Sequence, residues 1–177
     1  LLKKVSNSLS QDYFVADVSK SSDFKSMKNF AYKKYGNIDI IVNNAGVTHK
    51  PKFMESVNEK DFNKVFNVNA KSVYYCAKYF VPKMKKNRKG VILNVASTAG
   101  ISPRPKLNWY NATKGWMITA TKAMAIELAT FNVRVNAIAP VAGLTPLLKS
   151  FMGGNTPKKK RSFLSTNPIG RFSTPED

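Results

Sequence analysis

Three short segments that are mainly apolar constrain the fold of this chain more than any other feature. They lie at residues 38–42, 90–96 and 133–139, and each is too short for a helix of ordinary length. Strands that are apolar at successive positions are buried on both faces, as the strands of parallel sheets are. The segments therefore indicate a parallel sheet covered on both faces, to which residues 12–18 are expected to add a fourth strand.

Longer segments with apolar residues at helical spacing separate these strands. Helices are predicted over residues 23–35, 59–86 and 109–131. The alternation of strand and helix indicates the α/β class, with a Rossmann-like, doubly wound parallel sheet. The 177 residues suffice for a single domain, and the Met-, Gly- and Lys-rich residues 147–166 are expected to form a flexible flap.

Polar or turn-forming residues follow each predicted strand. Asp17 lies at the end of the first, residues 43–46 follow the second, Ser97 follows the third and Pro140 follows the last. In open parallel sheets, ligands bind at the carboxyl ends of the strands. These four positions are therefore expected to share one site.

A tyrosine and a lysine at the start of the third predicted helix suggest the chemistry of that site. Tyr110 and Lys114 are four residues apart and lie on one helix face. A lysine ammonium beside a phenol favours the phenolate, which adapts the phenol to proton transfer. Ser97 is placed to hydrogen-bond the same reacting oxygen. A solvated tyrosine and lysine on a helix surface are the alternative interpretation of the pair alone.

The net charge of +19 raises a second function class, a non-enzymatic binding protein whose basic surface contacts nucleic acid or an anionic membrane. Only five of the 29 basic residues are arginines, and the lysines are spread over the whole chain. Arginine is the residue favoured for bidentate phosphate and base contacts. The distribution argues against a specific nucleic-acid partner. Salt-sensitive DNA binding without cofactor binding would favour the second class.

The sequence gives little support for a metal site, a membrane-spanning segment or a disulfide. The single His49 and the single Cys76 cannot form a zinc site, and one cysteine excludes an internal disulfide. No apolar segment is long enough to span a bilayer, and the first residues lack the apolar core of a signal peptide. A cytoplasmic protein with no bound metal and no membrane contact is expected.

Several motifs together resemble the short-chain dehydrogenase/reductase family. They are the Asn-Asn-Ala-Gly turn at 43–46, the Tyr-Asn-Ala-Thr-Lys segment at 110–114 with a serine thirteen residues before its tyrosine, Asn69 within Asn-Val-Asn-Ala, and residues 134–140. The resemblance covers essentially the whole chain. Residues 104–110 and 140–148 are similar to those of the glucose 1-dehydrogenase and 3-oxoacyl-carrier-protein reductase members.

The resemblance implies a catalytic set and a cofactor, NAD or NADP. Tyr110 would be the general acid and base that interconverts a small carbonyl compound and its alcohol. Ser97 would orient the substrate oxygen, Lys114 would lower the pKa of Tyr110 and hold the nicotinamide ribose, and Asn69 would hold a water molecule. The cofactor-binding positions implied are Asp17, Val18, Asn43, Ala45, Gly46, Tyr110, Lys114, Pro140 and Thr145. Helices 59–86 and 109–131 would pack across subunits of a dimer or tetramer.

The chain also departs from the family pattern. It contains no Gly-x-x-x-Gly-x-Gly turn for the pyrophosphate, and the family places that turn, and the residue that selects NAD or NADP, before Leu1. Val141 follows Pro140 where the family usually has glycine. We therefore expect an incomplete domain without the first two strands and the last strand. Such a truncated member would expose the edge of strand 38–42 and have impaired or no activity.

Overall fold

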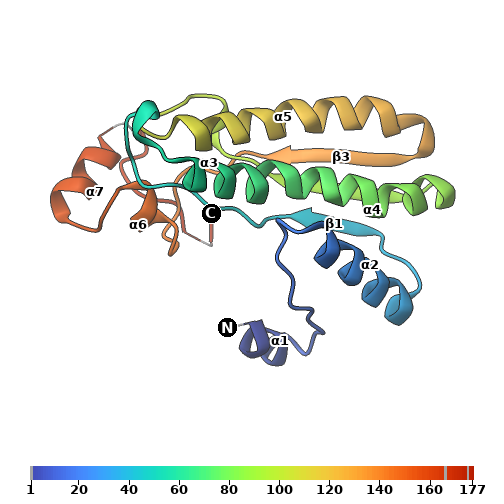
Figure 1. Ribbon diagram of the computed structural model, residues 1–177. Helices are drawn as coiled ribbons and strands as arrows, with labels where there is room; N and C mark the ends of the chain where they lie inside the picture. Colours follow the sequence, from blue (N-terminus) through green and yellow to red (C-terminus); the bar gives the residue numbers. More distant parts are fainter. Residues whose placement is uncertain (1, 166, 175) are drawn as a thin grey trace.

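The computed structural model describes residues 2–165, 167–174 and 176–177, and it contains a three-stranded parallel sheet at its centre. The strands are β1 (Ile40–Asn43), β2 (Gly90–Val95) and β3 (Val133–Ile138), in the spatial order β1-β2-β3 (Figure 1). Ile41 pairs with Ile92, and Ile92 pairs with Val135. These strands confirm the predictions at 38–42, 90–96 and 133–139 and the α/β fold class.

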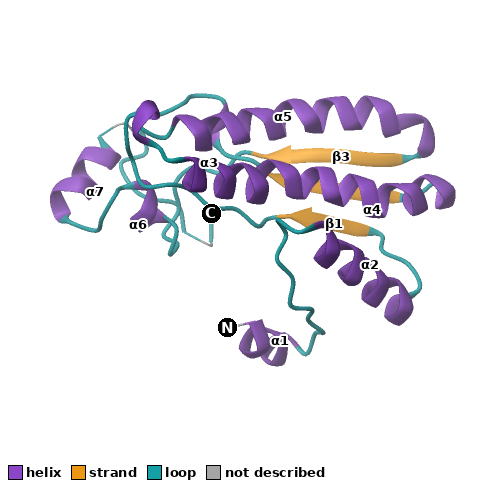
Figure 2. Ribbon diagram, viewed as in Figure 1, coloured by secondary structure: helices purple, strands orange, loops and turns teal. Residues whose placement is uncertain are grey.

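Helices connect the strands, and the three long helical regions agree with the predictions (Figure 2). The α-helices are α1 (Leu2–Leu9), α2 (Ser21–Tyr35), α3 (Glu59–Phe66), α4 (Ser72–Asn87), α5 (Asn108–Leu128), α6 (Leu148–Phe151) and α7 (Pro157–Leu164). The shorter turns are η1 (Met54–Ser56), η2 (Asn67–Lys71), η3 (Thr98–Gly100) and η4 (Ala129–Phe131). A π-helical turn, η2, joins α3 to α4, so the predicted helix 59–86 is one continuous helical segment.

The main core lies on one face of the sheet. Ile92, Val133 and Val135 are buried there against side chains of α2, α4 and α5, among them Phe24, Phe80 and Leu128. On the opposite face Ile40, Val42, Arg134, Asn136 and Ile138 are exposed. Within the described residues, helices therefore cover one face of the sheet, and the prediction that both faces are covered is wrong for this part of the fold.

The predicted strand at 12–18 is also wrong, because these residues form an irregular segment leading into α2. Phe14 packs on Phe30 of α2 with ring centroids 5.3 Å apart, while Val15 is 76% exposed. A strand needs a neighbour to accept its backbone hydrogen bonds, and none of the described strands pairs with this segment. Its apolar side chains alone do not hold it in a sheet.

The free edge of β1 agrees with the sequence prediction. Ile40 and Val42 are 64% and 52% exposed, and β1 pairs only with β2 among the described strands. An apolar, unpaired strand edge is a template for pairing with another strand. Strand β1 is therefore an unpaired, apolar edge of the described sheet.

The C-terminal segment forms two short helices, α6 and α7, beside the carboxyl ends of the strands (Figure 1). Leu148, Met152 and Phe172 form a small buried cluster there, separate from the main core. Backbone bonds tie it to the loop after β3, since Leu144 N donates to Ser173 O over 2.9 Å. The predicted flap thus contains helices that are anchored by their own apolar cluster.

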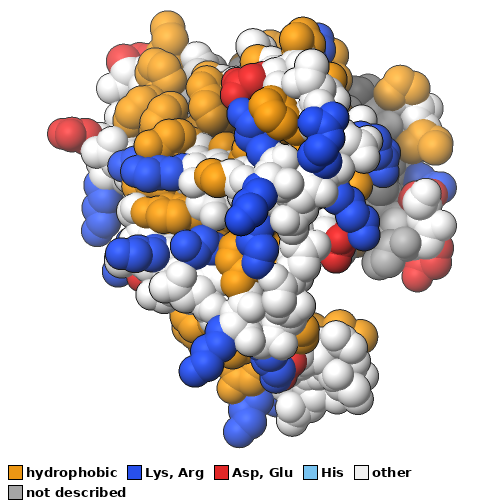
Figure 3. All heavy atoms as spheres, turned by 90° about the vertical axis from the view of Figure 1, so that its right-hand side faces the viewer, with side chains coloured by type: hydrophobic (Ala, Val, Ile, Leu, Met, Phe, Trp, Pro, Cys, Tyr) orange, Lys and Arg blue, Asp and Glu red, His pale blue; other side chains and the backbone are white. Residues whose placement is uncertain are grey.

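Basic side chains are interleaved with hydrophobic and uncharged ones on the face seen in Figure 3. No described helix is both long enough and apolar enough to cross a membrane. In the described residues, no three side chains of His, Cys, Asp or Glu are grouped to hold a metal ion.

Candidate active site

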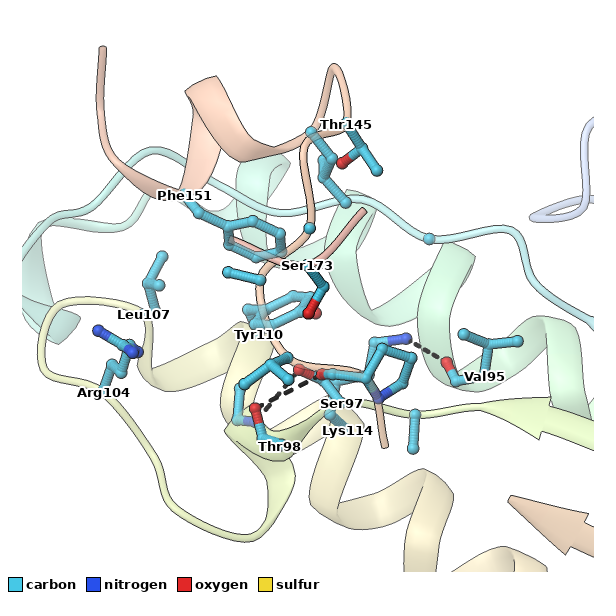
Figure 4. A pocket seen from close by; sticks show the side chains of 18 of the residues that line it. Val95, Ser97, Thr98, Arg104, Leu107, Tyr110, Lys114, Thr145, Phe151 and Ser173 are labelled. Carbon is cyan, nitrogen blue, oxygen red and sulfur yellow. Dashed lines mark hydrogen bonds between the residues drawn. The ribbon is translucent and has the colours of Figure 1, made fainter. Parts of the chain in front are cut away.

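A cavity of about 400 Å³ opens at the carboxyl ends of the strands, where α5 begins and the C-terminal segment folds over them (Figure 4). Its polar and charged lining residues are Asn44, Ser97, Thr98, Arg104, Tyr110, Lys114, Thr145, Asn167, Ser173 and Thr174. Its apolar lining includes Leu107, Leu147, Phe151 and Phe163. The location agrees with the expectation of a shared site for the turn at 43–46, Ser97 and Pro140, and not for Asp17.

Ser97 enters the cavity from the end of β2. It is the residue before η3, in extended conformation, and its Oγ accepts a hydrogen bond from Ala99 N at 3.1 Å. This bond satisfies a backbone donor at the start of the turn, as N-terminal capping serines do. The turn thereby holds Ser97 in the wall of the cavity that Tyr110 also lines.

Tyr110 and Lys114 lie on the first turns of α5 and are 5% and 4% exposed. The Lys114 Nζ donates to Val95 O over 2.7 Å, and it lies 5.9 Å from the centre of the Tyr110 ring (Figure 4). The interpretation of this pair as a solvated surface tyrosine and lysine is therefore excluded. The three predicted residues Ser97, Tyr110 and Lys114 line one cavity.

Burial controls the proton affinities of both groups. It lowers the pKa of Lys114 to about 8, because a buried ammonium loses its hydration. It raises the pKa of Tyr110, and the hydrogen bond with Ser97 opposes that rise. Lys114 was expected to lower the pKa of Tyr110, but it does not contribute to the pKa shift of Tyr110 described here. That effect of Lys114 stays a prediction. Tyr110 is a neutral phenol at pH 7, which is the proton-donating form.

A glycine allows the loop after Ser97 to approach α5 closely. A Cβ on Gly100 would lie 2.6 Å from the backbone carbon of Lys114 and 2.7 Å from the nitrogen of Gly115. Real Cβ atoms essentially never come so close, so only glycine fits between this turn and the helix. Gly100 thereby sets the distance between the Ser97 turn and the helix that bears Tyr110. This role was not predicted from the sequence, although a glycine three residues after Ser97 could have suggested it.

Asn69 lies in η2 and is fully buried. Its Nδ2 donates to Val47 O at 2.9 Å and to Thr113 Oγ1 at 3.1 Å, and its Oδ1 accepts from Val47 N at 2.9 Å. The side chain thus ties the loop after β1 to α5. Asn69 does not line the cavity among the residues described, and its predicted water contact stays a prediction. A π-turn of this kind commonly marks a functional site.

Some residues of the turn at 43–46 line the cavity, and others do not. Asn43 turns into the protein and donates to Asn94 Oδ1 at 2.8 Å, and Asn94 in turn donates to Thr121 Oγ1 at 2.8 Å. This chain of polar side chains links β1, β2 and α5. Asn44 and Gly46 line the cavity, as expected for this turn, while Asn43 and the exposed Ala45 do not. Cofactor binding by Asn43, Ala45 and Gly46 stays a prediction.

Asp17 and Val18 do not line the cavity. Asp17 accepts hydrogen bonds from Ser19 N at 2.9 Å and Ser19 Oγ at 2.7 Å, and these bonds lower its pKa. Val18 packs against the main core. In this structure Asp17 therefore stabilises the turn before α2, and its predicted contact with the cofactor stays a prediction.

The segment after β3 forms the opposite wall of the cavity. Pro140 lines it, as expected for a strand end, and so do Val141 and Thr145. Cofactor binding by Pro140 and Thr145 stays a prediction. The Phe151 ring lies edge-on to the Tyr110 ring, with centroids 4.9 Å apart (Figure 4). Helix α6 therefore packs against the Tyr110 ring at this wall of the cavity. Neither this aromatic contact nor the presence of Arg104 in the lining was predicted.

The space beside Lys114 fits the nicotinamide end of a dinucleotide. A Cβ on residue 46 would lie 3.6 Å from Lys114 Nζ and 3.6 Å from Asn69 Oδ1, so Gly46 keeps this space open. Lys114 uses one of its three N–H donors on Val95, which leaves two for a ligand. The printed sequence contains no glycine-rich turn for a pyrophosphate, so the fit applies to the nicotinamide end alone.

Comparisons with known proteins agree with this geometry. The family model described as enoyl-(acyl carrier protein) reductase matches residues 1–177. The chain is 44% identical over 162 residues to 4-formylbenzenesulfonate dehydrogenase TsaC1/TsaC2 of Comamonas testosteroni, an alignment covering 91% of this chain. The chain spans less than two thirds of the length of that enzyme, 64%.

Two solved structures have the same fold. The 3-ketoacyl-(acyl-carrier-protein) reductase from Brucella melitensis complexed with NADH is 42% identical, with a TM-score of 0.91, covering 99% of this chain and 72% of that one. ElxO with NADP bound is 30% identical, with a TM-score of 0.86, covering 97% of this chain and 71% of that one. With its serine, tyrosine and lysine gathered at the strand ends, the chain belongs to the short-chain dehydrogenase/reductase family.

Proposed function

We propose that this site interconverts a carbonyl compound and its alcohol with NAD or NADP, and that Tyr110 is the general acid and base. The observation that carries the proposal is the convergence of Ser97, Tyr110 and Lys114 in one cavity, although they come from two different elements. Membership of a family whose solved structures hold NADH or NADP supports the choice of cofactor.

Each residue has a role that follows from its surroundings. The Tyr110 hydroxyl gives its proton to the carbonyl oxygen during reduction and takes a proton from the alcohol during oxidation. The Ser97 hydroxyl hydrogen-bonds the same oxygen and holds it beside Tyr110. The Lys114 ammonium favours the phenolate of Tyr110, and Asn69 holds the loop after β1 in place. Phe151 packs against the Tyr110 ring and holds it in the cavity wall.

The nicotinamide cofactor supplies the hydride when it is bound. Lys114 would hold its ribose, and the walls at Gly46, Pro140 and Thr145 would contain its nicotinamide end. Residues 147–166 would shape the part of the pocket that receives the substrate, because Leu147, Phe151 and Phe163 line the cavity there. The buried, single Cys76 suits a reducing compartment such as the cytoplasm.

A chimera tests the proposal. The 177 residues by themselves are expected to reduce carbonyl compounds slowly or not at all, because they contain no glycine-rich turn and leave β1 exposed. Adding the part of the Brucella melitensis reductase that this chain does not match is expected to restore reduction. The measurement is loss of NADH and NADPH absorbance with a panel of aldehydes and ketones.

The same assay contains its own controls. The added reductase segment alone, without these 177 residues, must be inactive. Rapid turnover by the 177 residues alone would contradict the expected need for the glycine-rich turn. A folded chimera that binds NADH or NADPH but reduces no member of the panel would contradict the proposed function.

We also propose that the protein forms a dimer or tetramer through the helical regions 59–86 and 109–131. Apolar side chains on these helices are exposed, including Phe66, Tyr74, Trp116 and Ile126, the last of them 79% exposed. Static light scattering is expected to show a mass at least twice that of the 19.7 kDa chain. Ile126→Lys combined with Trp116→Lys should shift that mass to the monomer, and a monomeric parent chain would contradict the proposal.

A further inference from the structure

The cavity is lined by segments that contain no acidic residue. The sequence has no Asp or Glu between Asp61 and Glu127, and none between Glu127 and Glu176. Nearly all the lining comes from residues 95–114 and 140–174, which fall inside these two intervals. Among the described lining residues, Arg104 and Lys114 carry charge and both are cationic. The charged side chains of the described lining are therefore both positive, which favours an anionic ligand.

Arg104 is held at the cavity wall by its own neighbours. Its guanidinium carbon lies 4.0 Å from the centre of the Phe163 ring, and its backbone oxygen accepts from Asn111 Nδ2 at 2.8 Å. Figure 4 places Arg104 beside Leu107 and on the opposite side of Tyr110 from Lys114. The two cations therefore have separate positions, and Lys114 lies closer to the end of β2.

The side chain of Arg104 is partly buried, and burial lowers its pKa. A partly desolvated guanidinium gains more from an anion than a fully hydrated one does, because the local dielectric constant is lower. Its planar donors match the two oxygens of a carboxylate. Apolar side chains of Leu107 and Phe151 belong to the same lining, Leu107 beside Arg104 and Phe151 against the Tyr110 ring.

We infer that the substrate of this site carries an anionic group at the end of an apolar body, and that Arg104 binds this group while the carbonyl or alcohol faces Tyr110. This inference rests on the proposed function for the identity of the reacting group. Arg104 is then a specificity-determining residue, since it selects charged substrates without taking part in proton transfer. A carboxylate is the simplest group with the required chemistry.

A matched pair of alcohols tests the inference through binding rather than turnover. The probes are 4-(hydroxymethyl)benzoate and its uncharged methyl ester, titrated into the full chain at pH 7 and followed by ligand-observed NMR. We expect the acid to bind about tenfold more tightly than the ester, as a charge-assisted hydrogen bond would provide. Added salt should weaken binding of the acid and leave the ester unaffected.

Three variants identify the residue responsible. Arg104→Met is expected to remove the preference for the acid, and Arg104→Lys should retain part of it. Arg134→Met removes the same charge from the exposed face of β3, outside the cavity lining, and should keep the full preference. Equal binding of acid and ester, no binding of either, or a preference that survives Arg104→Met would overturn the inference.

The binding assay tests the inference about Arg104, and the chimera assay tests the proposed function. Either one can therefore fail without the other. Selective binding of the acid with no turnover in the chimera would leave the Arg104 site in place and remove the proposed function. Turnover of carbonyl compounds with no preference for charged ones would support the proposed function and overturn the inference about Arg104.

Discussion

Tyr110→Phe is expected to reduce turnover in the chimera by about 10²- to 10⁴-fold, the usual contribution of a positioned general acid or base. The substitution removes one hydroxyl and retains the ring that packs on Phe151. The fold and the cavity walls should therefore be unchanged, and the loss should appear in kcat. Steady-state kinetics with the carbonyl compound found active in the panel gives the measurement.

The pH profile distinguishes proton transfer from a packing role. Burial raises the pKa of Tyr110, so the phenol keeps its proton at neutral pH and carbonyl reduction should be supported there. Alcohol oxidation needs the phenolate and should accelerate as the pH rises. Tyr110→Phe should remove this pH dependence, and Tyr13→Phe, at an exposed position, should preserve it. A Tyr110→Phe variant with the parent's rate and profile would exclude Tyr110 as the acid and base.

Lys114→Met is expected to make the chain more stable at pH 7 while it abolishes the chemistry. Burial lowers the pKa of Lys114 from an ordinary value near 10.5 to about 8, so the charged form is disfavoured in the folded state. The lowered pKa corresponds to a cost of about 3 kcal/mol in the free energy of unfolding. Losing the bond to Val95 offsets part of the gain, and a net increase of about 1–2 kcal/mol remains.

The sign of the pH effect follows from proton linkage. Below about pH 8 both the folded and the unfolded chain hold the proton on Lys114, and the destabilising effect is complete. Between about pH 8 and the ordinary lysine pKa, the unfolded chain binds more protons, so this effect decreases as the pH rises. Urea denaturation at several pH values should show the stability difference between Lys114→Met and the parent shrinking over this interval.

An exposed lysine provides the matched control. Lys86→Met, on the exposed part of α4, should change stability by no more than about 0.5 kcal/mol at any of these pH values. A Lys114→Met chain less stable than the parent at pH 7 would show that the bond to Val95 and the packing of the lysine stem outweigh the cost of burying the charge.

Local signals in the sequence were sufficient where a residue's role depends on its near neighbours. The strand segments at 38–42, 90–96 and 133–139 are apolar over their own length, and each forms a strand. Tyr110 and Lys114 share a helix face because four residues make about one turn, whatever surrounds the helix. Ser97 follows its strand directly, so its place at the strand end was also predictable.

Roles that depend on distant partners were not predictable in this way. Residues 12–18 have the composition of a strand, but a strand exists only where another strand accepts its hydrogen bonds. Asn43 carries the family's motif, yet it turns toward Asn94, a residue far along the chain. The close approach of Gly100 to α5 and the contact of Phe151 with Tyr110 likewise join segments that are separate in the sequence.

The sequence by itself determined the α/β class, the three strands, the long helices and the serine, tyrosine and lysine of the site, because periodicity and short spacing encode them locally. Only the tertiary structure decided that Asn69 hydrogen-bonds the loop after β1 and does not line the cavity. The tertiary structure also decided that Asp17 stabilises a turn. It also decided that Arg104 reaches the cavity. These outcomes depend on which side chains long-range packing brings within hydrogen-bonding distance, and on how much water that packing excludes.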